Sequence, residues 1–349
     1  MHSIYKKVRV QEVIQETRDS KTFKLALADG SPLEYVAGQF ITLVFPKSGE
    51  KEDRRSYSFS TAPGIDPDPA ITLKWVENGE YSRKLIDYVK KGDEFLTIGA
   101  SGFFTLPDDI DNHDRVFFLA AGSGITPVFS LLKTLLARDN EVQIVLVYSN
   151  KSKDDAIFLE ELIALRNIHK DRFRIEFLYS NSPDLTRARL GKWLLENLLK
   201  EYGLPDPPKT LFFLCGPYDY MRMATIVLQT EGVPPENIRR ENFSAVKPRF
   251  RPQPDDKAPH RVDILILDEE YSIECQYPET ILQKARKSGI ALPYSCESGQ
   301  CGTCAATCVS GEIFMWNNEV LLDSEVEKGR VLTCTGYPVG GDVVIRFDV

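Results

Sequence analysis

Four cysteines lie close together near the C-terminal end of the sequence, within the stretch PYSCESGQCGTCAATC. They are Cys296, Cys301, Cys304 and Cys308, and the whole chain of 349 residues contains only seven cysteines. In a chain otherwise poor in cysteine, clustered thiols are more often metal ligands or redox groups than disulfide partners. The stretch therefore indicates metal or redox chemistry.

The spacing of the cysteines distinguishes between kinds of metal site. Four residues separate Cys296 from Cys301, two separate Cys301 from Cys304, and a further twenty-nine precede Cys334. This is the spacing of plant-type [2Fe-2S] ligands. Zinc is the alternative, but zinc sites more often show two pairs of cysteines with two residues inside each pair. We predict that Cys296, Cys301, Cys304 and Cys334 hold a [2Fe-2S] cluster.

Other residues of the same stretch have simpler interpretations. Gly299 and Gly302 lie between the ligands, where a loop that wraps around a cluster needs residues with positive φ. Such a loop turns backbone N–H groups towards the sulfurs and so makes their negative charge tolerable. Cys308 falls outside the ligand spacing, and we interpret it as a small buried hydrophobe.

Composition restricts the class of protein. The first twenty residues mix charges throughout, so they lack the apolar centre of a secretory signal. No run of about 18 apolar residues occurs, which argues against a membrane span. With a formal net charge of -8, we also expect no nucleic-acid partner. The sequence predicts a cytoplasmic protein, because free thiols persist in a reducing compartment.

The chain divides into parts with different residue patterns. Residues 1–108 contain short β-type runs separated by Gly, Pro and Asp, which predicts an antiparallel barrel. Residues 109–243 alternate apolar strands with helical stretches, which predicts a parallel sheet with crossover helices. Residues 244–260 hold four prolines and no hydrophobic period, so we expect an extended linker. Residues 261–349 carry fourteen acidic against seven basic residues, so the acidity belongs to this last part.

Four motifs follow one another in a fixed order: RSYSFS, AAGSGITP, CGP and the cysteine constellation. In this order they resemble the flavin-dependent NAD(P)H oxidoreductases of the ferredoxin-NADP reductase superfamily with a plant-type ferredoxin domain at the C-terminus. The resemblance covers nearly the whole chain and extends to reductase components of the phenylacetyl-CoA epoxidase type and of related oxygenases and desaturases. It implies a multidomain fold with an FAD-binding antiparallel β-barrel, a Rossmann-like α/β NAD(P) domain and a β-grasp ferredoxin domain.

The resemblance gives the first motif a role in binding flavin. It implies that Arg55 meets the flavin phosphate, that Tyr57 packs on the isoalloxazine ring, and that Ser58 reaches the reactive nitrogen. A guanidinium suits a phosphate, and a flat side chain suits a flat ring. Gly79 and Ser82 match the family's G-x-x-S entry to a short helix, which offers backbone donors to a pyrophosphate. The loop GASGFFTL resembles the one that closes on adenylate, so FAD is favoured over FMN.

The second motif suits a nicotinamide dinucleotide. An expected strand runs into Gly122 and Gly124 and then into a helix, so backbone amides and the helix N-terminus can meet a pyrophosphate. Pro127 stands where the common dinucleotide fingerprint has its third glycine. With Thr126 before it, the segment departs from that fingerprint and matches the reductase family's G-x-G-I-T-P.

The third motif, and a phenylalanine that follows it, complete the implied site. Cys215, Gly216 and Pro217 end an expected strand, and the family places this cysteine next to the nicotinamide C4. A buried strand cysteine is the alternative interpretation. Phe243 in RRENF resembles the family's E-x-F, and we expect it either to pack near the flavin or to end the sheet.

The choice between NADPH and NADH depends on the segment YSNKSKDDAIF. Lys151 and Lys153 would pair with a 2′-phosphate, whereas Asp154 and Asp155 would oppose it. The family often uses an arginine here, and the segment contains none. NADPH is slightly favoured, and both coenzymes stay open.

Electron counting then gives a function. A nicotinamide delivers two electrons as hydride, the cluster accepts one at a time, and a flavin can do both, so the flavin stands between them. Ser58 and Cys215 are the expected orienting residues at the reacting centre. We predict a reductase that passes electrons to a partner oxygenase component, with a ring-hydroxylating dioxygenase or fatty-acid desaturase as alternative acceptors. A non-catalytic redox sensor on the same scaffold is the alternative outside enzymes.

Overall fold

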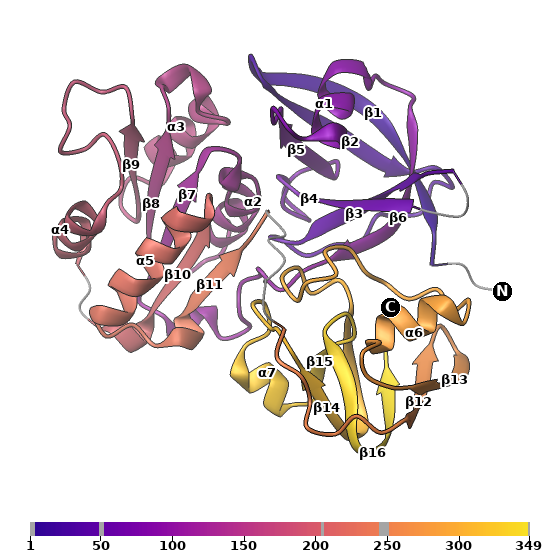
Figure 1. Cartoon of the computed structure of the whole chain (residues 1–349). Helices are drawn as coiled ribbons and strands as arrows, with labels where there is room; N and C mark the ends of the chain where they lie inside the picture. The colour runs from indigo at the N-terminus through magenta and orange to yellow at the C-terminus, as the bar shows by residue number, and fades with distance from the viewer. Residues whose placement is uncertain (1–3, 49–51, 204–205, 244–250, 348–349) are drawn as a thin grey trace.

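The computed structural model describes residues 4–48, 52–203, 206–243 and 251–347 (Figure 1). Its strands form three separate sheets, two of five strands and one of six. The parts that carry the sheets follow one another along the chain, and the third lies against both of the others (Figure 1). No helix among the described residues is long and apolar enough to cross a membrane.

The first sheet is antiparallel, with the strand order β4-β3-β6-β1-β2-β5. A bridge between Phe59 and Ile71 joins its two end strands and closes the barrel. Leu85 and Ile86 of the single helix pack into the same core as the strands. Its elements are β1 (Lys6–Thr17), β2 (Ser20–Leu27), β3 (Phe40–Pro46), β4 (Glu52–Ser58), β5 (Ala70–Lys74), α1 (Glu80–Tyr88) and β6 (Glu94–Ser101).

The second sheet is wholly parallel, with the order β11-β10-β7-β8-β9. All six residues of β10 are buried, as expected for a strand that is covered on both faces. Two hydrophobic cores lie on opposite faces, one with α2 and α3 and the other with α4 and α5. The strands are β7 (Arg115–Ala121), β8 (Gln143–Asn150), β9 (Phe173–Tyr179), β10 (Thr210–Cys215) and β11 (Ile238–Glu241). The helices are α2 (Ile125–Leu136), α3 (Leu159–Ile168), α4 (Lys192–Tyr202) and α5 (Tyr218–Thr230), and five short 3-10 turns join these elements.

The third sheet is mixed, with the order β13-β12-β16-β14-β15 and one parallel pair, β12 with β16. The helix α6 begins with a capping box between Thr280 and Gln283 and places its apolar residues in the core. The elements are β12 (His260–Ile266), β13 (Glu269–Cys275), α6 (Ile281–Lys287), β14 (Ala305–Met315), α7 (Asp323–Glu327), β15 (Arg330–Leu332) and β16 (Gly336–Arg346). The predicted fold class, an antiparallel barrel followed by a parallel α/β sheet and a smaller α+β part, is confirmed.

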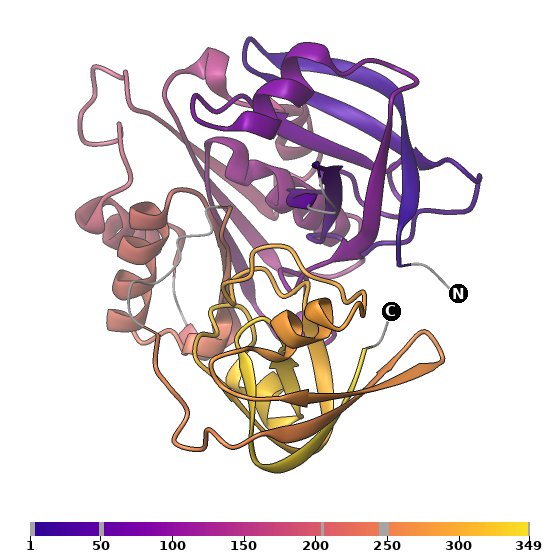
Figure 2. The ribbon, with the colours of Figure 1, turned by 45° about the vertical axis from the view of Figure 1, so that its right-hand side comes forward.

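The expected linker, 244–260, falls partly outside the described residues, which resume at Arg251. From Arg251 to Pro259 the chain has no helix or strand, and it runs along the outside of the third part (Figure 2). The Arg251 guanidinium lies 4.9 Å from the ring centroid of Trp316. The Asp256 carboxylate accepts a hydrogen bond from the Gly340 N–H at 2.7 Å. The described half of the linker is therefore attached to the part that follows it.

Candidate functional site

A cavity of about 450 Å³ lies between the barrel and the start of the parallel sheet. It is lined by residues from four separate sequence motifs. The ones named as candidates from the sequence are Arg55, Tyr57, Ser58, Gly79, Ser82, Thr126 and Phe243. The fold thus brings together the residues predicted to hold a flavin, and their contacts with it stay a prediction.

Arg55 provides a positive charge at this cavity. Its guanidinium lies 4.9 Å from the ring centroid of Tyr81, and half of its side chain is exposed. The helix α1 begins beside it, with Gly79 at the N-cap and Ser82 in the first turn. A helix N-terminus and an accessible guanidinium together favour a phosphate or pyrophosphate.

Three polar side chains meet where the barrel touches the parallel sheet. The Ser58 hydroxyl donates a hydrogen bond to Glu241 Oε1 at 2.7 Å. Glu241 ends β11 and stands opposite Cys215 in the register of β10 and β11. Its second oxygen, Oε2, is buried and has no hydrogen-bond partner among the described residues. An orphaned oxygen at the wall of a site is free to meet a bound group.

Burial changes the protonation of this group of side chains. It raises the pKa of Glu241 to about 8, although the Ser58 hydroxyl opposes the shift. It also raises the pKa of the Cys215 thiol, and the neighbouring Glu241 adds to that effect. Near neutral pH Cys215 is therefore an uncharged thiol, and Glu241 holds a proton for much of the time. The sequence analysis placed Ser58 and Cys215 at the reacting centre but missed Glu241; the available signal was its place at a strand end in RRENF.

The glycine-rich turn packs directly on the end of β10. A Cβ atom on Gly124 would lie 2.1 Å from the Cys215 carbonyl oxygen, so only glycine allows this approach. The Thr126 hydroxyl donates to the Ser123 carbonyl at 3.0 Å and fixes the turn that begins α2. The N-terminus of α2 is therefore held beside the buried thiol.

A second helix begins at the same edge of the parallel sheet. Gly216 approaches Ala121 closely, and Pro217 is the N-cap of α5. Pro127 is buried in the first turn of α2, and Gly122 has a φ of 56°. Two helix N-termini thus meet at the carboxyl ends of β7 and β10, where open α/β sheets bind nucleotides.

The charged segment after β8 is only partly available to a ribose. Asp155 is buried and accepts hydrogen bonds from Ser152 Oγ at 2.5 Å and from Arg18 of the barrel at 3.4 Å. Asp154, Lys151 and Lys153 are exposed. One of the two carboxylates expected to oppose a 2′-phosphate is therefore engaged with the barrel.

The four predicted cluster ligands lie together in the third part. The Cys296 side chain is hydrogen-bonded to the thiols of Cys301 and Cys334, and Cys334 is also bonded to Cys304. These contacts form a chain of two pairs. No group of three His, Cys, Asp or Glu side chains in the described part of the sequence converges as the ligands of a single ion would. Two neighbouring pairs fit a two-iron cluster better than one tetrahedral zinc ion.

The loop around these thiols has the expected backbone. Gly299 and Gly302 have φ values of 77° and 76°, as predicted. The backbone N–H of Gln300 donates to Cys296 Sγ at 3.5 Å, which is the kind of contact that stabilises a charged sulfur. Cys308 lies on β14 with its thiol bonded to the Ser310 carbonyl, outside the chain of ligand thiols.

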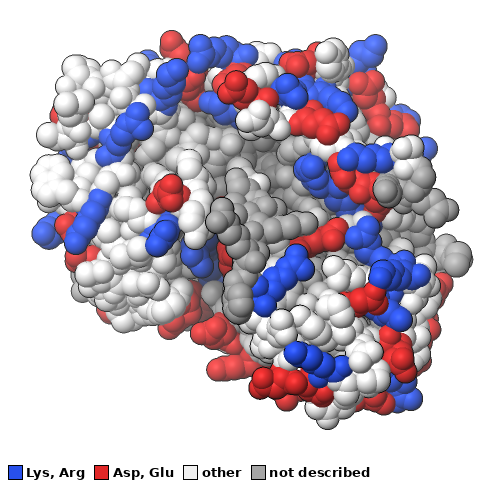
Figure 3. All heavy atoms as spheres, viewed as in Figure 1, with Lys and Arg blue, Asp and Glu red and all other residues white. Residues whose placement is uncertain are grey.

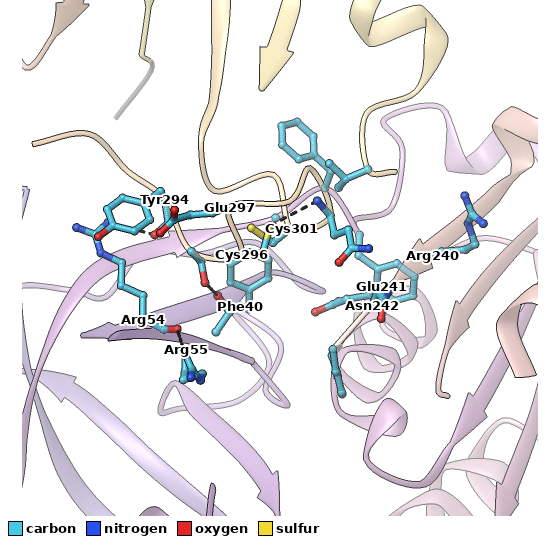
Figure 4. Close-up of a pocket in the computed structure, with 18 of the residues that line it drawn as sticks. Phe40, Arg54, Arg55, Arg240, Glu241, Asn242, Tyr294, Cys296, Glu297 and Cys301 are labelled. Atoms are coloured by element: carbon cyan, nitrogen blue, oxygen red, sulfur yellow. Dashed lines mark hydrogen bonds between the residues drawn. The ribbon is translucent and has the colours of Figure 1, made fainter. Parts of the chain in front are cut away.

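A second cavity, of about 520 Å³, connects the flavin residues with the cysteine loop. Arg55 and Phe243 line this cavity as well as the first one. Cys296 and Cys301 line it from the other side, facing Phe40 of β3 (Figure 4). A group bound against the flavin motif and a cluster on the cysteine loop would thus share one space.

Comparison with known proteins gives these sites a family. The family model "2Fe-2S iron-sulfur cluster binding domain" matches residues 264–339, a range that contains all four predicted ligands. The model "Oxidoreductase NAD-binding domain" matches residues 118–226 and contains both helix N-termini described above.

Three relatives match almost the whole chain. The ferredoxin reductase component of 3-ketosteroid-9-alpha-monooxygenase from Rhodococcus rhodochrous is 30% identical, over 97% of this chain and 95% of the relative. One of the subunits of 1,2-phenylacetyl-CoA epoxidase from Escherichia coli is 31% identical, over 97% and 96%. The reductase component of glycine betaine monooxygenase from Pseudomonas aeruginosa is 31% identical, over 97% and 94%. The chain belongs to this family of oxygenase reductase components.

Solved structures agree with this family at the level of the fold. Phthalate dioxygenase reductase is 23% identical, covers 98% of both chains and has a TM-score of 0.60. An intact type IV self-sufficient cytochrome P450 monooxygenase contains the same arrangement in 41% of its length, with a TM-score of 0.70 and 22% identity. This oxygenase reductase is therefore a flavin-dependent NAD(P)H oxidoreductase with a [2Fe-2S] ferredoxin part.

The surface shows how the parts of the reductase are exposed. The face in Figure 3 is hollowed between the barrel and the parallel sheet, and acidic side chains gather over α7 of the ferredoxin part. This helix has the sequence DSEVE. A concentration of one sign of charge steers the approach of a partner of opposite sign.

Proposed function

We propose that this reductase passes electrons from NAD(P)H through FAD to the [2Fe-2S] cluster and then to a separate oxygenase component. The observation that carries the proposal is the 520 Å³ cavity, because flavin-motif residues and two cluster cysteines line it together. A shared space of this kind would let an electron pass from a bound flavin to the cluster over a short distance.

The residues of the chain divide the work of binding and orientation. Arg55 and the N-terminus of α1 would hold the flavin phosphates, and the N-termini of α2 and α5 would hold the dinucleotide. Cys296, Cys301, Cys304 and Cys334 would hold the cluster. When bound, the flavin supplies the exchange between a hydride and single electrons.

Ser58, Cys215 and Glu241 would act at the meeting point of flavin and nicotinamide. The uncharged Cys215 thiol offers a small neutral surface at the end of β10, and Ser58 directs its hydroxyl towards Glu241. The Ser58–Glu241 pair can hold a proton, because burial raises the pKa of Glu241 to about 8. We propose that the pair keeps this proton available beside the reactive nitrogen of the flavin.

FAD and NADPH are the cofactors that the site favours. The loop at Gly99, which resembles the adenylate loop of FAD-binding members, supports FAD. The engagement of Asp155 with Arg18 supports NADPH, because it removes one negative charge from the neighbourhood of Lys151 and Lys153. We place the reductase in the cytoplasm, where its seven free cysteines would stay reduced.

The final acceptor is proposed to be an oxygenase component of the kind served by the relatives. Relatives named for phenylacetyl-CoA epoxidase, a ketosteroid monooxygenase and glycine betaine monooxygenase are almost equally similar to this chain. The substrate is therefore a property of the partner chain. Acidic residues on the ferredoxin part, such as those of α7, favour a partner with a basic docking surface.

An anaerobic titration tests the proposal. The purified protein is expected to show flavin bands together with broad cluster absorption, and NADPH should bleach both at lower concentration than NADH. Flavin absorption without cluster absorption, after reconstitution with iron and sulfide, would overturn the assignment of the four cysteines. Loss of the flavin bands alone on NADPH addition would overturn the electron path.

A further inference from the structure

Arg54 lies beside Arg55 on β4 but points to the opposite face of the strand. Side chains alternate between the two faces of a strand, so neighbouring residues serve different surroundings. Arg55 reaches the flavin cavity with half of its side chain exposed, whereas only 2% of the Arg54 side chain is exposed. Figure 4 shows Arg54 extending towards Tyr294 of the ferredoxin part.

All five N–H groups of the Arg54 guanidinium have an acceptor. Nη1 donates to the carbonyl oxygens of Tyr294 at 3.1 Å and Leu292 at 3.4 Å. Nε donates to Glu52 Oε1 at 2.7 Å, and Nη2 contacts the same oxygen at 2.6 Å. Nη2 also donates to the Tyr5 hydroxyl at 3.0 Å. A buried guanidinium is tolerated only when its charge and its donors are satisfied in this way.

The segment that Arg54 holds leads directly into the cluster loop. The Arg54 guanidinium lies 3.6 Å from the ring centroid of Tyr294, two residues before the ligand Cys296. Between them, Ser295 shares a hydrogen bond of 2.9 Å with Ser56 of β4. The Tyr294 hydroxyl returns to β4 by donating to Glu52 at 3.1 Å. Three side chains of β4 thus fix the chain just before the first cluster ligand.

We propose that Arg54 is a positioning residue for electron transfer, which holds the cluster loop at a fixed place relative to the flavin. The strand β4 carries both sites: Arg55 and Tyr57 serve the flavin, and Arg54 and Ser56 serve the cluster loop. In the transfer itself one electron leaves the reduced flavin and one ferric iron becomes ferrous; Arg54 exchanges neither electron nor proton. Because transfer slows steeply with distance, a loosened loop lowers the rate of this step alone.

The chemistry of arginine explains why another cation would not suffice. Two carbonyl oxygens, a carboxylate and a hydroxyl surround one planar group that also lies on an aromatic face. Lysine has three donors on a single nitrogen and lacks the planar fork, so it cannot satisfy this set. We therefore expect Arg54→Lys to restore the charge but not the position of the loop.

The test compares two steps in holoprotein loaded with flavin and cluster. Rapid mixing with NADPH under anaerobic conditions gives the rate of flavin reduction and the rate of cluster reduction separately. We expect Arg54→Gln and Arg54→Lys to slow cluster reduction by about tenfold or more and to leave flavin reduction within about twofold, as displacement of a reacting group by ~1 Å can do. Arg9→Gln, at the exposed pair between Arg9 and Glu94, is the matched control and should change neither rate.

Two further measurements separate position from general damage. Hydrogen–deuterium exchange should rise in the peptide containing residues 290–296 and stay unchanged in the flavin-binding strands. Tyr294→Leu removes the aromatic face and should repeat the slow cluster step without altering β4, whereas Tyr294→Phe keeps the face and should retain most of the rate. These two variants keep the test decisive if Arg54→Gln does not fold.

The inference rests on the proposed electron path, and its failure can be told apart from failure of that path. If the wild-type cluster is not reduced by NADPH, the proposed function is wrong. If the wild-type cluster is reduced and the Arg54 and Tyr294→Leu variants match its rate, the role of Arg54 is wrong. Equal slowing of flavin and cluster reduction would also overturn it, because a positioning residue acts on one step.

Discussion

Replacing Glu241 by glutamine should change how the stability of the reductase depends on pH. Burial raises the pKa of this carboxyl from 4.5 to about 8. Below pH 4.5 the folded and the unfolded chain both hold the proton. Between 4.5 and 8 the folded protein keeps a proton that the unfolded chain has lost, so the free energy of unfolding falls as the pH rises.

The size of the effect follows from the same two pKa values. One proton difference changes the free energy of unfolding by about 1.4 kcal/mol per pH unit. From pH 5 to pH 8 the Glu241 contribution is therefore a loss of about 3–4 kcal/mol. Glutamine has no proton to lose and its amide oxygen can still accept the Ser58 hydrogen bond, so Glu241→Gln should remove this slope.

Urea unfolding of the wild type and of Glu241→Gln at pH 5, 6, 7 and 8 measures the difference. The two proteins should be close in stability at pH 5 and should diverge as the pH rises, with the variant the more stable at pH 8. Glu312→Gln, at an exposed carboxyl of β14, is the control and should follow the wild type at every pH. Parallel curves for the wild type and Glu241→Gln would show that the carboxyl is not held protonated by burial.

Four other substitutions give distinct expected outcomes. Cys304→Ser should abolish cluster absorption while NADPH still bleaches the flavin, seen by spectroscopy. Cys308→Ser should leave the cluster spectrum unchanged, and a lost cluster would contradict the ligand set. Gly302→Ala, at a φ of 76° with a Cβ 2.6 Å from the Phe103 ring, should destabilise the protein by about 1–3 kcal/mol in urea and reduce iron content. Arg55→Ala should weaken flavin retention about tenfold or more in dialysis, since it removes a charged phosphate contact; unchanged retention would refute its role.

The sequence predicted the fold class because its signals are local. The apolar run of β10 is buried throughout, and the positive φ of Gly299 and Gly302 was expected from the need of the loop to turn around its ligands. The ligand spacing of the cysteines is also local for three of the four residues. Patterns of this kind depend on period and backbone conformation, which neighbouring residues determine.

The contacts between parts of the chain could not be predicted in the same way. Alternation along β4 indicates that Arg54 and Arg55 face opposite sides, but not which side another part will cover. Asp155 was expected to face a ribose, and its partner Arg18 lies 137 positions earlier. Glu241 became significant only when the barrel placed Ser58 beside it, 183 positions away. Each of these roles depends on packing between segments with no common local pattern.

The most direct test of the electron path compares native protein with flavin-stripped protein that retains its cluster. On anaerobic mixing with NADPH, native protein should lose flavin absorption first and cluster absorption second. The stripped protein should keep an oxidised cluster in NADPH and yet be reduced by dithionite, which shows that the cluster is intact. Reduction of the cluster by NADPH at the native rate without flavin would contradict the central claim that electrons reach the cluster through the flavin.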